Sequence, residues 1–317
     1  MWELIQIALA YSSTIALMAA GITLIYMATG TFNFAHASFV AWAFYIVFTL
    51  KTFLGGSPYY YLPAAAGFSG LLGVITYITV NRYLLKRGAD MVTLMMSTLG
   101  MDLAFYAVLN MYADYLSEVH KLYSRQIVLK PYDFTVTVLG TETRGVTIVS
   151  IITVIIIIVA LHLFLKKTKF GIAMRATIEN PELASIQGIS PELIYITAWF
   201  LGGALAGLGG GLMSLFTAGY PAVGFYYIVT MFTGSIVGSL YSIFGSLLGG
   251  FLVGLAEYIG IYEVSVVFGG RAVAYRLAIP LTVMVIALLF FPEGLGRIQW
   301  SRVAEKIGLL RSGGEER

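Results

Sequence analysis

The sequence predicts an all-α fold, a polytopic transmembrane helix bundle with about eight to ten spans. Of the 317 residues, 59% are hydrophobic and only 11% are charged, whereas about 25% of an average soluble domain is charged. The charges also leave long gaps, since no Asp, Glu, Lys or Arg occurs in residues 4–50, 52–81 or 193–256. Because a helix crosses the hydrocarbon core in about 20 residues, the last gap must cross the membrane more than once.

The apolar runs predict nine spans and their orientation. Basic residues near span ends gather on the cytoplasmic side, and here they follow the third span, follow the fifth span and fill the tail. With the N-terminus outside, nine crossings place all three clusters in the cytoplasm of a multi-pass plasma-membrane protein. Residues 225–242 and 243–262 could also be half-helices that re-enter the membrane. The expected spans are 4–29, 37–54, 62–83, 91–112, 146–165, 193–216, 225–242, 243–262 and 273–291.

We interpret residues 1–317 as one transmembrane domain with three segments outside the membrane. These are an extracytosolic loop at about 113–145, a cytoplasmic loop at about 166–192 and a cytoplasmic tail at about 293–317. The outer loop is rich in charged residues, and loops longer than about 12–15 residues are uncommon without a function. It therefore either helps to dock an external partner or is a solvated connector.

Glycines recur at four-residue spacing in the later spans. Gly203, Gly207 and Gly211 form one such series, and Gly234/Gly238, Gly245/Gly249 and Gly250/Gly254 form pairs. This spacing places small residues on one helix face, where membrane helices can approach closely. Packing is the favoured interpretation, and a hinge or a pathway lining is the alternative.

The cytoplasmic loop contains the signals of a separate short helix at about 181–187. Asn180 can be its N-cap and Pro181 its first residue, while Glu182 faces the positive helix end. Gly188 stands where a left-handed residue ends a helix. A connector needs no capped helix, so we interpret this one as a surface for a partner, with a helix resting on the membrane as the alternative.

Five short motifs occur in order along residues 30–295, and their order resembles the LivH/LivM-type permeases, the membrane subunits of branched-chain amino acid ABC importers. The first motif is also similar to that of related urea permeases. The motifs are Asn33-Phe34-Ala35-His36, Ser97-Thr98-Leu99-Gly100, the run from Gly171 to Ile189, Gly254-Leu255-Ala256-Glu257 and Phe291-Pro292-Glu293-Gly294-Leu295.

The resemblance implies a type II ABC-importer-like permease with protein partners on both sides of the membrane. Cytoplasmic ABC ATPase subunits, a second permease subunit (identical or different) and an extracytosolic solute-binding protein are expected, within membrane lipid. The run from Gly171 resembles the family's ATPase-coupling loop. The residues expected to couple to the ATPase are Arg175, Glu179, Pro181, Glu182, Ala184 and Gly188.

Polar residues inside the apolar runs are candidates for the translocation pathway. Asn33 and His36 lie between two spans and need polar partners, in a structural network or along a pathway. Asp102 lies within the fourth span, where a charge costs several kcal/mol unless it is paired or faces water. Together with Ser97 and Thr98, these residues form the predicted pathway set. Glu257 is expected simply to reach the interface near a span end.

Two departures from the family pattern concern the solute. Ala37-Ser38 replaces the expected Gly-Glu after His36, and the segment from Thr230 to Ser242 lacks the family's basic residue. The alternatives are therefore an ABC permease for urea, short-chain amides or another small polar solute and, less favoured, an ion-coupled secondary transporter using Asp102. An intramembrane hydrolase built on Ser69 and His162 would rest on a four-residue match alone.

The sequence also excludes several functions. There is no G-x-x-x-x-G-K-[ST] phosphate loop and no H-E-x-x-H motif, so the chain is expected to be a transporter subunit that cannot hydrolyse ATP. Cysteine is absent, which removes thiolate metal sites and cysteine nucleophiles. No metal, cofactor or nucleic-acid partner is expected.

Overall fold

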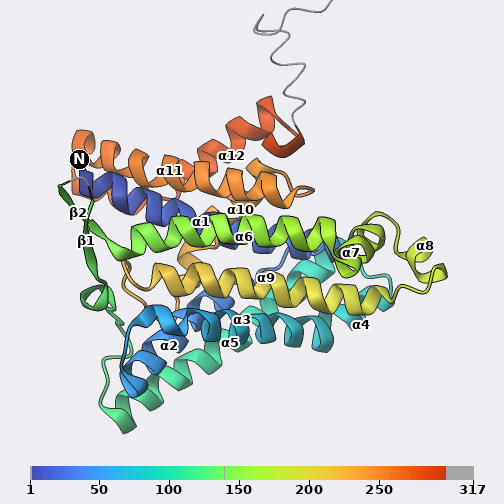
Figure 1. Cartoon of the computed structure of the whole chain (residues 1–317), viewed down its shortest axis with the longest axis horizontal. Coiled ribbons are helices and arrows are strands. Elements are labelled where there is room, and N and C mark those ends of the chain that lie inside the picture. The colour runs from blue at the N-terminus through green and yellow to red at the C-terminus, as the bar shows by residue number, and fades with distance from the viewer. Residues whose placement is uncertain (1, 139, 298–317) are drawn as a thin grey trace, which may run out of the picture.

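The computed structural model describes residues 2–138 and 140–297, which form a helical bundle with one small hairpin (Figure 1). The helices are α1 (Trp2–Thr29), α2 (His36–Leu54), α3 (Leu62–Thr76), α4 (Arg82–Lys86), α5 (Met91–His120), α6 (Gly145–Lys167), α7 (Lys169–Glu179), α8 (Pro181–Ile186), α9 (Pro191–Met213), α10 (Val223–Gly238), α11 (Ile243–Phe268) and α12 (Ala278–Phe290). The antiparallel strands β1 (Thr135–Val138) and β2 (Thr141–Arg144) form the hairpin.

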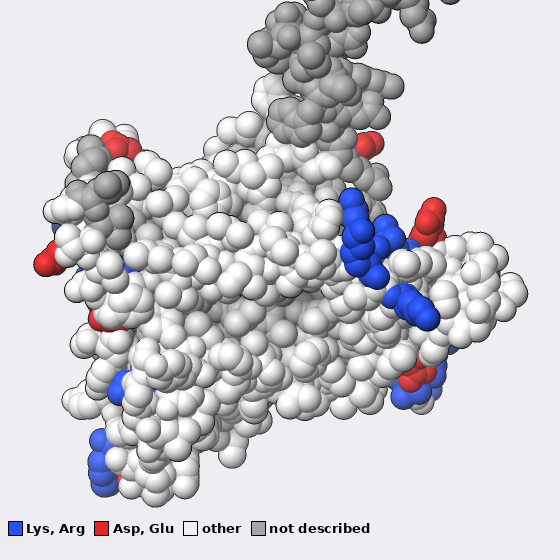
Figure 2. Space-filling view, viewed as in Figure 1, with Lys and Arg blue, Asp and Glu red and all other residues white. Residues whose placement is uncertain are grey.

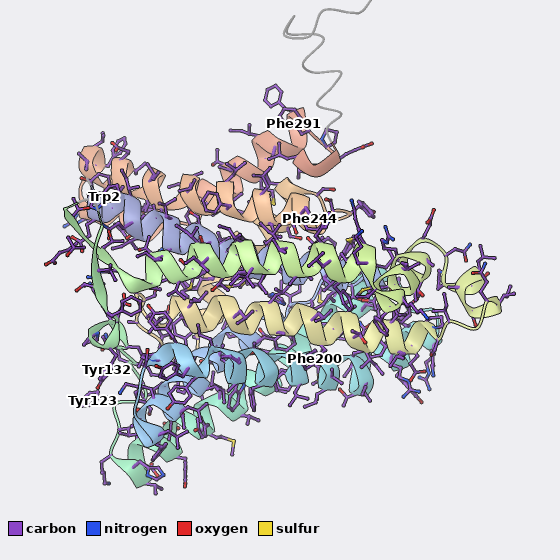
Figure 3. All side chains as sticks on the ribbon, in the orientation of Figure 1. Trp2, Tyr123, Tyr132, Phe200, Phe244 and Phe291 are labelled. Atoms are coloured by element: carbon purple, nitrogen blue, oxygen red, sulfur yellow. The ribbon has the colours of Figure 1, made fainter. Side chains whose placement is uncertain are left out.

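The charged side chains lie at the two ends of the bundle on the face that Figure 2 shows, with an uncharged band between them. One end carries the N-terminus and the hairpin, and we call it the hairpin end. The other carries α4, α7 and α8 and is called the α8 end (Figure 1). Trp2, Tyr123 and Tyr132 lie at the hairpin end (Figure 3), in keeping with the enrichment of Trp and Tyr at membrane interfaces. This distribution is that of a membrane-spanning bundle.

Eight helical stretches in the described part of the chain are long and apolar enough to cross a membrane. One is the combined segment Pro58–Lys86, where a π-helical turn at Tyr77–Asn81 joins α3 to α4. With 16 residues, α10 is too short to cross a membrane by itself. It runs parallel to α1, as two contacts show: Tyr227 meets Tyr11, and Ser235 meets Thr23 further along both helices. Residues 214–222 connect α9 to α10, and within them Gly219 pairs with Ile127. The predicted all-α bundle is confirmed.

Two helices begin inside the bundle rather than at its ends. At the start of α2, His36 Nε2 donates to the Met18 carbonyl oxygen at 3.0 Å, well before α1 ends at Thr29. The start of α10 lies against it, since a Cβ on Gly224 would overlap the Ala37 carbonyl. The predicted half-helix in 225–242 thus corresponds to α10, whereas 243–262 belongs to the continuous helix α11.

Close backbone contacts hold the centre of the bundle together. α1 is almost entirely buried and packs against α9, α10 and α11. On α9, a Cβ at Gly203 or Gly207 would come within 2.5 or 2.6 Å of carbonyl oxygens of α3. The pairs predicted later in the chain meet one another too, with Gly234 against Gly250 and Gly238 against Gly249. Helix packing is therefore the role of these glycines.

Two predictions about the segments outside the membrane are wrong. α5 continues to His120, past residue 113 where the outer loop was expected to begin, because Lys121 in the left-handed conformation ends the helix there. The short helix expected at about 181–187 is present as Pro181–Ile186. Residues 169–179, expected as part of a loop, form α7, whose N-cap Thr168 accepts from the Gly171 amide. The tail expected at 293–317 lies outside the described residues after Arg297.

Replacing Gly207 with leucine should destabilise the bundle, because the new side chain would overlap the Ala65 carbonyl of α3. Overpacking of this kind costs roughly 1–3 kcal/mol, occasionally more. The measurement is the melting temperature and monodisperse yield of purified Gly207→Leu. Gly67→Leu is the matched control, since no atom lies within 4 Å of a Cβ at that position of α3. Equal stability of the two variants would contradict the packing role.

Candidate translocation and coupling sites

One face of α5 holds the chain where it turns from α1 into α2. The Asp102 carboxylate accepts the Ser38 amide at 2.9 Å, and the Ser38 hydroxyl donates to the Asp102 carbonyl at 3.0 Å. One turn away, the Thr98 hydroxyl accepts the Phe34 amide at 3.0 Å. An amide in the first turn of a helix has no partner within the helix, and a negative charge there is favourable. Asp102, 1% exposed, therefore caps α2 from a neighbouring helix.

Asn33 and His36 lie in the same region, fully buried. His36 uses Nε2 for the Met18 carbonyl, whereas His36 Nδ1 and both polar side-chain atoms of Asn33 have no hydrogen-bond partner among the described residues. The Thr230 hydroxyl on α10 is buried in the same way. Buried polar groups are usually paired. The unpaired atoms of Asn33, His36 and Thr230 therefore make this region the strongest candidate for a functional site inside the bundle. Thr230 was missed because isolated threonines are common in membrane helices.

Ser97 does not belong to this group. Its hydroxyl donates to the Leu94 carbonyl of its own helix at 2.7 Å. The structure thus places four of the five predicted pathway residues, Asn33, His36, Thr98 and Asp102, around the start of α2.

Aromatic rings lie around the starts of α2 and α10. Phe232 of α10 lies 5.0 Å from Phe34 and 5.8 Å from Phe32 between ring centroids. Phe225, near the start of α10, meets Tyr106 of α5 at 5.2 Å. Phe32, Phe34, Phe225 and Phe232 are only half-buried. The region therefore combines unpaired polar atoms with partly accessible apolar rings, as small-molecule sites commonly do.

At the α8 end, α7 and α8 form a compact corner. The Asn180 side chain accepts the Leu183 amide at 2.9 Å and Gly188 adopts φ +83°, which confirms the expected cap and stop. Pro191 is the first residue of α9, and the Ser190 side chain before it makes no capping hydrogen bond. A groove of about 360 Å³ lies between α7 and α8, lined by Ala176, Glu179, Asn180, Leu183, Ala184 and Gln187.

The predicted coupling residues divide into an exposed set and a buried one. Arg175, Glu179, Pro181, Glu182 and Gly188 are exposed, whereas Ala184 is 3% exposed. Ala184 therefore packs against the protein on the buried side of α8 and does not face a partner. The surface of α8 is unexpectedly apolar, with Leu183 53% and Ile186 84% exposed. Large exposed apolar side chains beside charged ones are typical of protein interaction sites.

A buried ion pair joins α11 to the segment before α12. Glu257, expected at the interface, is 1% exposed; it pairs with Arg276 and accepts the Tyr11 hydroxyl at 2.8 Å. The Arg276 guanidinium also lies 4.8 Å from the centre of the Tyr11 ring. The interpretation of Glu257 as interfacial was wrong because its partner, nineteen positions further along the chain, gave no local signal.

The candidate hydrolase pair has no support. The Ser69 hydroxyl is buried and donates to the Phe39 carbonyl at 2.8 Å. His162 is exposed on α6 and faces Phe244.

Outside the spans, two carboxyl groups have shifted pKa values. Burial raises the pKa of Asp133 beside the hairpin, opposed by hydrogen bonds from the Tyr59 hydroxyl and the Val146 amide. Hydrogen bonds from the Thr93 side chain lower the pKa of Asp90, the N-cap of α5. Both groups fix element ends.

Two substitutions of Asp102 should distinguish the contribution of its hydrogen bond to the Ser38 amide from the contribution of its charge. Asp102→Ala leaves the buried Ser38 amide unpaired, which costs about 1–3 kcal/mol. Asp102→Asn keeps an oxygen acceptor for this amide, so its loss of stability should be distinctly smaller. The melting temperatures of the purified variants provide the measurement, and equal losses would show that the hydrogen bond does not matter.

The chain matches known transport proteins over nearly its whole length. Residues 4–288 match the family described as branched-chain amino acid transport system / permease component. The probable branched-chain amino acid transport permease protein LivH of Methanocaldococcus jannaschii is 36% identical, covering 93% of this chain and 92% of the relative.

Two bacterial proteins are more distant relatives. The high-affinity branched-chain amino acid transport system permease protein BraD of Pseudomonas aeruginosa is 28% identical over 93% of this chain and 95% of its own. LivH of Escherichia coli is 27% identical over 92% and 94%. No solved structure matches the chain. With its apolar helices, the chain is a multi-pass protein of the plasma membrane, and it belongs to the family of branched-chain amino acid transport system permease components.

Proposed function

We propose that this chain forms the solute pathway of an importer for branched-chain amino acids, driven by separate ATPase subunits that bind the α8 end. The three relatives are named for branched-chain amino acid transport, and the same solute class is assigned here. The observation that carries the proposal is the corner of α7 and α8, with its capped helix, exposed apolar side chains and groove. The chain itself has no phosphate loop.

The α8 end is assigned to the cytoplasm. It carries Lys166, Lys167, Lys169 and Arg175 of α6 and α7, and Arg82, Lys86 and Arg87 in and directly after α4. Figure 2 shows basic side chains gathered there. Positive residues favour the cytoplasmic side. The hairpin end then faces outward, where an extracytosolic binding protein delivers the solute.

The pathway is assigned to the region between the starts of α2 and α10. Helices interrupted inside a membrane direct their N-terminal dipoles at anionic substrate groups in several transporters. Because Thr98 and Asp102 already accept the amides at the start of α2, the amino-acid carboxylate would meet the amide end of α10 and the unpaired side-chain amide of Asn33. The half-buried phenylalanines would meet its apolar side chain. A second permease subunit, identical or different, completes the enclosure.

Energy coupling follows from the connection between α8 and the bundle. α9 begins at Pro191, directly after the corner, and packs against α1, α2 and α3. ATP-driven movement of the ATPase pair displaces α8, and α9 carries that displacement to the helices around the pathway. Asp102 then serves as a cap, without a coupling ion.

Impermeant thiol labelling tests the orientation, and the absence of cysteine gives a clean background. Ser185→Cys at the exposed surface of α8 should stay unlabelled in intact cells and react after lysis. Tyr123→Cys, 89% exposed at the hairpin end, should react in intact cells. The reverse pattern would overturn the orientation.

Substitutions in α8 test the docking surface. Glu182→Arg reverses an exposed charge, and Ala184→Pro should cost the short helix about 3 kcal/mol. Both should reduce co-purification of the ATPase and ATP-driven uptake. Glu118→Arg, an exposed reversal on α5 near the hairpin end, is the matched control and should retain the ATPase. Wild-type retention and uptake in both α8 variants would make the corner a simple connector.

A further inference from the structure

A second cavity at the α8 end lies away from the groove beside α8. It has a volume of about 460 Å³ and lies between the end of α1, the α3–α4 segment and the start of α9. Ala28, Leu85, Tyr77 and Tyr195 supply apolar and aromatic walls, and Arg82, Lys86 and Glu192 bring charge to it. We propose that this cavity binds the headgroup of an anionic phospholipid.

The charges of the cavity favour an anion. The Glu192 carboxylate pairs with Arg82 at 2.5 Å and with Lys86 at 3.4 Å, so two cations share one carboxylate and a positive charge remains. The positive end of the α9 dipole, at Pro191, adds to it. The Lys86 side chain is 60% exposed and can reach an incoming phosphate. Basic pockets between membrane helices on the cytoplasmic side suit phosphate headgroups.

The α3–α4 segment, which supplies Arg82, also offers a surface for an acyl chain. Leu71, Ile75 and Ile78 are 56%, 44% and 44% exposed, and their spacing places them on one face of the segment. Arg82, which lines the cavity, continues this series by another four residues. A lipid whose phosphate meets Arg82 can therefore lay its chain along an apolar stripe that leads into the membrane.

The π-helical turn shapes the cavity wall. Such turns insert an extra residue and occur frequently at functional sites. Here the turn begins at Tyr77, which is 2% exposed, and its ring packs 6.0 Å from Trp199 and 6.2 Å from Tyr195. The rings provide a rigid floor below the charged rim.

A free amino acid fits the cavity less well. Its ammonium group would need an acidic partner, and Glu192 already serves two cations. It would also leave the apolar stripe unused. The lipid explains both the excess of positive charge and the stripe.

Native mass spectrometry of the purified full-length chain tests the proposal with phosphatidylglycerol and phosphatidylcholine as probes. The wild type should retain phosphatidylglycerol preferentially. Arg82→Gln/Lys86→Gln should lower that retention by at least about tenfold. Arg87→Gln is the matched control, because Arg87 stacks on Tyr83 outside the cavity lining. Glu192→Gln should increase retention, a gain that misfolding cannot produce.

Three outcomes would overturn the proposal. Equal phosphatidylglycerol retention by the wild type and the double variant would place the lipid elsewhere. Displacement of the lipid by millimolar leucine or inorganic phosphate would identify a soluble ligand. Loss of the ATPase from the double variant in discs of phosphatidylcholine alone would assign Arg82 and Lys86 to the protein partner. This last result is independent of the Glu182→Arg test, so the two proposals can fail separately.

Discussion

The close approach of α9 to its neighbours is the constraint on which the bundle depends. Inside a bilayer, helices gain nothing from hydrophobic association with one another, and they pack instead through van der Waals contact and hydrogen bonds. α9 contacts α1 through Gly202 and Gly209 and α3 through Gly203 and Gly207. Each position brings the helix against a carbonyl oxygen of its neighbour. α9 thereby joins α1 and α3 into one unit.

The interruption of α2 is possible because α5 replaces the lost partners. A chain that turns inside the hydrocarbon region exposes amides that no water can satisfy. Thr98 and Asp102, one turn apart on α5, accept the amides of Phe34 and Ser38. Asn81 adds a hydrogen bond to Thr31 at the beginning of the turn. The polar residues of this region are thus largely structural, and among the described residues the side-chain polar atoms of Asn33 and Nδ1 of His36 are left without a hydrogen-bond partner.

Local signals in the sequence predicted much of this arrangement. The uncharged runs marked the spans, Asn180 and Gly188 marked the limits of α8, and glycine spacing marked the contact faces. Signals that depend on distant partners were missed. Nothing in the sequence near Glu257 indicates that Arg276 is its partner, and no local pattern shows that α2 starts inside the bundle, whereas the half-helix at α10 was anticipated as an alternative. α7 was missed because its charged residues were interpreted as part of a loop. Thr168, whose hydroxyl accepts the Gly171 amide, was the N-cap signal that could have indicated the helix.

The construction of α6 has a mechanical consequence. Most of its length is exposed, but both of its ends are fixed. At one end the Thr147 hydroxyl donates to the Gln6 carbonyl, and at the other Gly171 of α7 lies against the Phe164 carbonyl so tightly that no Cβ fits. With 23 residues, α6 spans about 34 Å. Because α6 is held at both ends and also packs against α1, it links the corner of α7 and α8 directly to the hairpin end along the outside of the bundle.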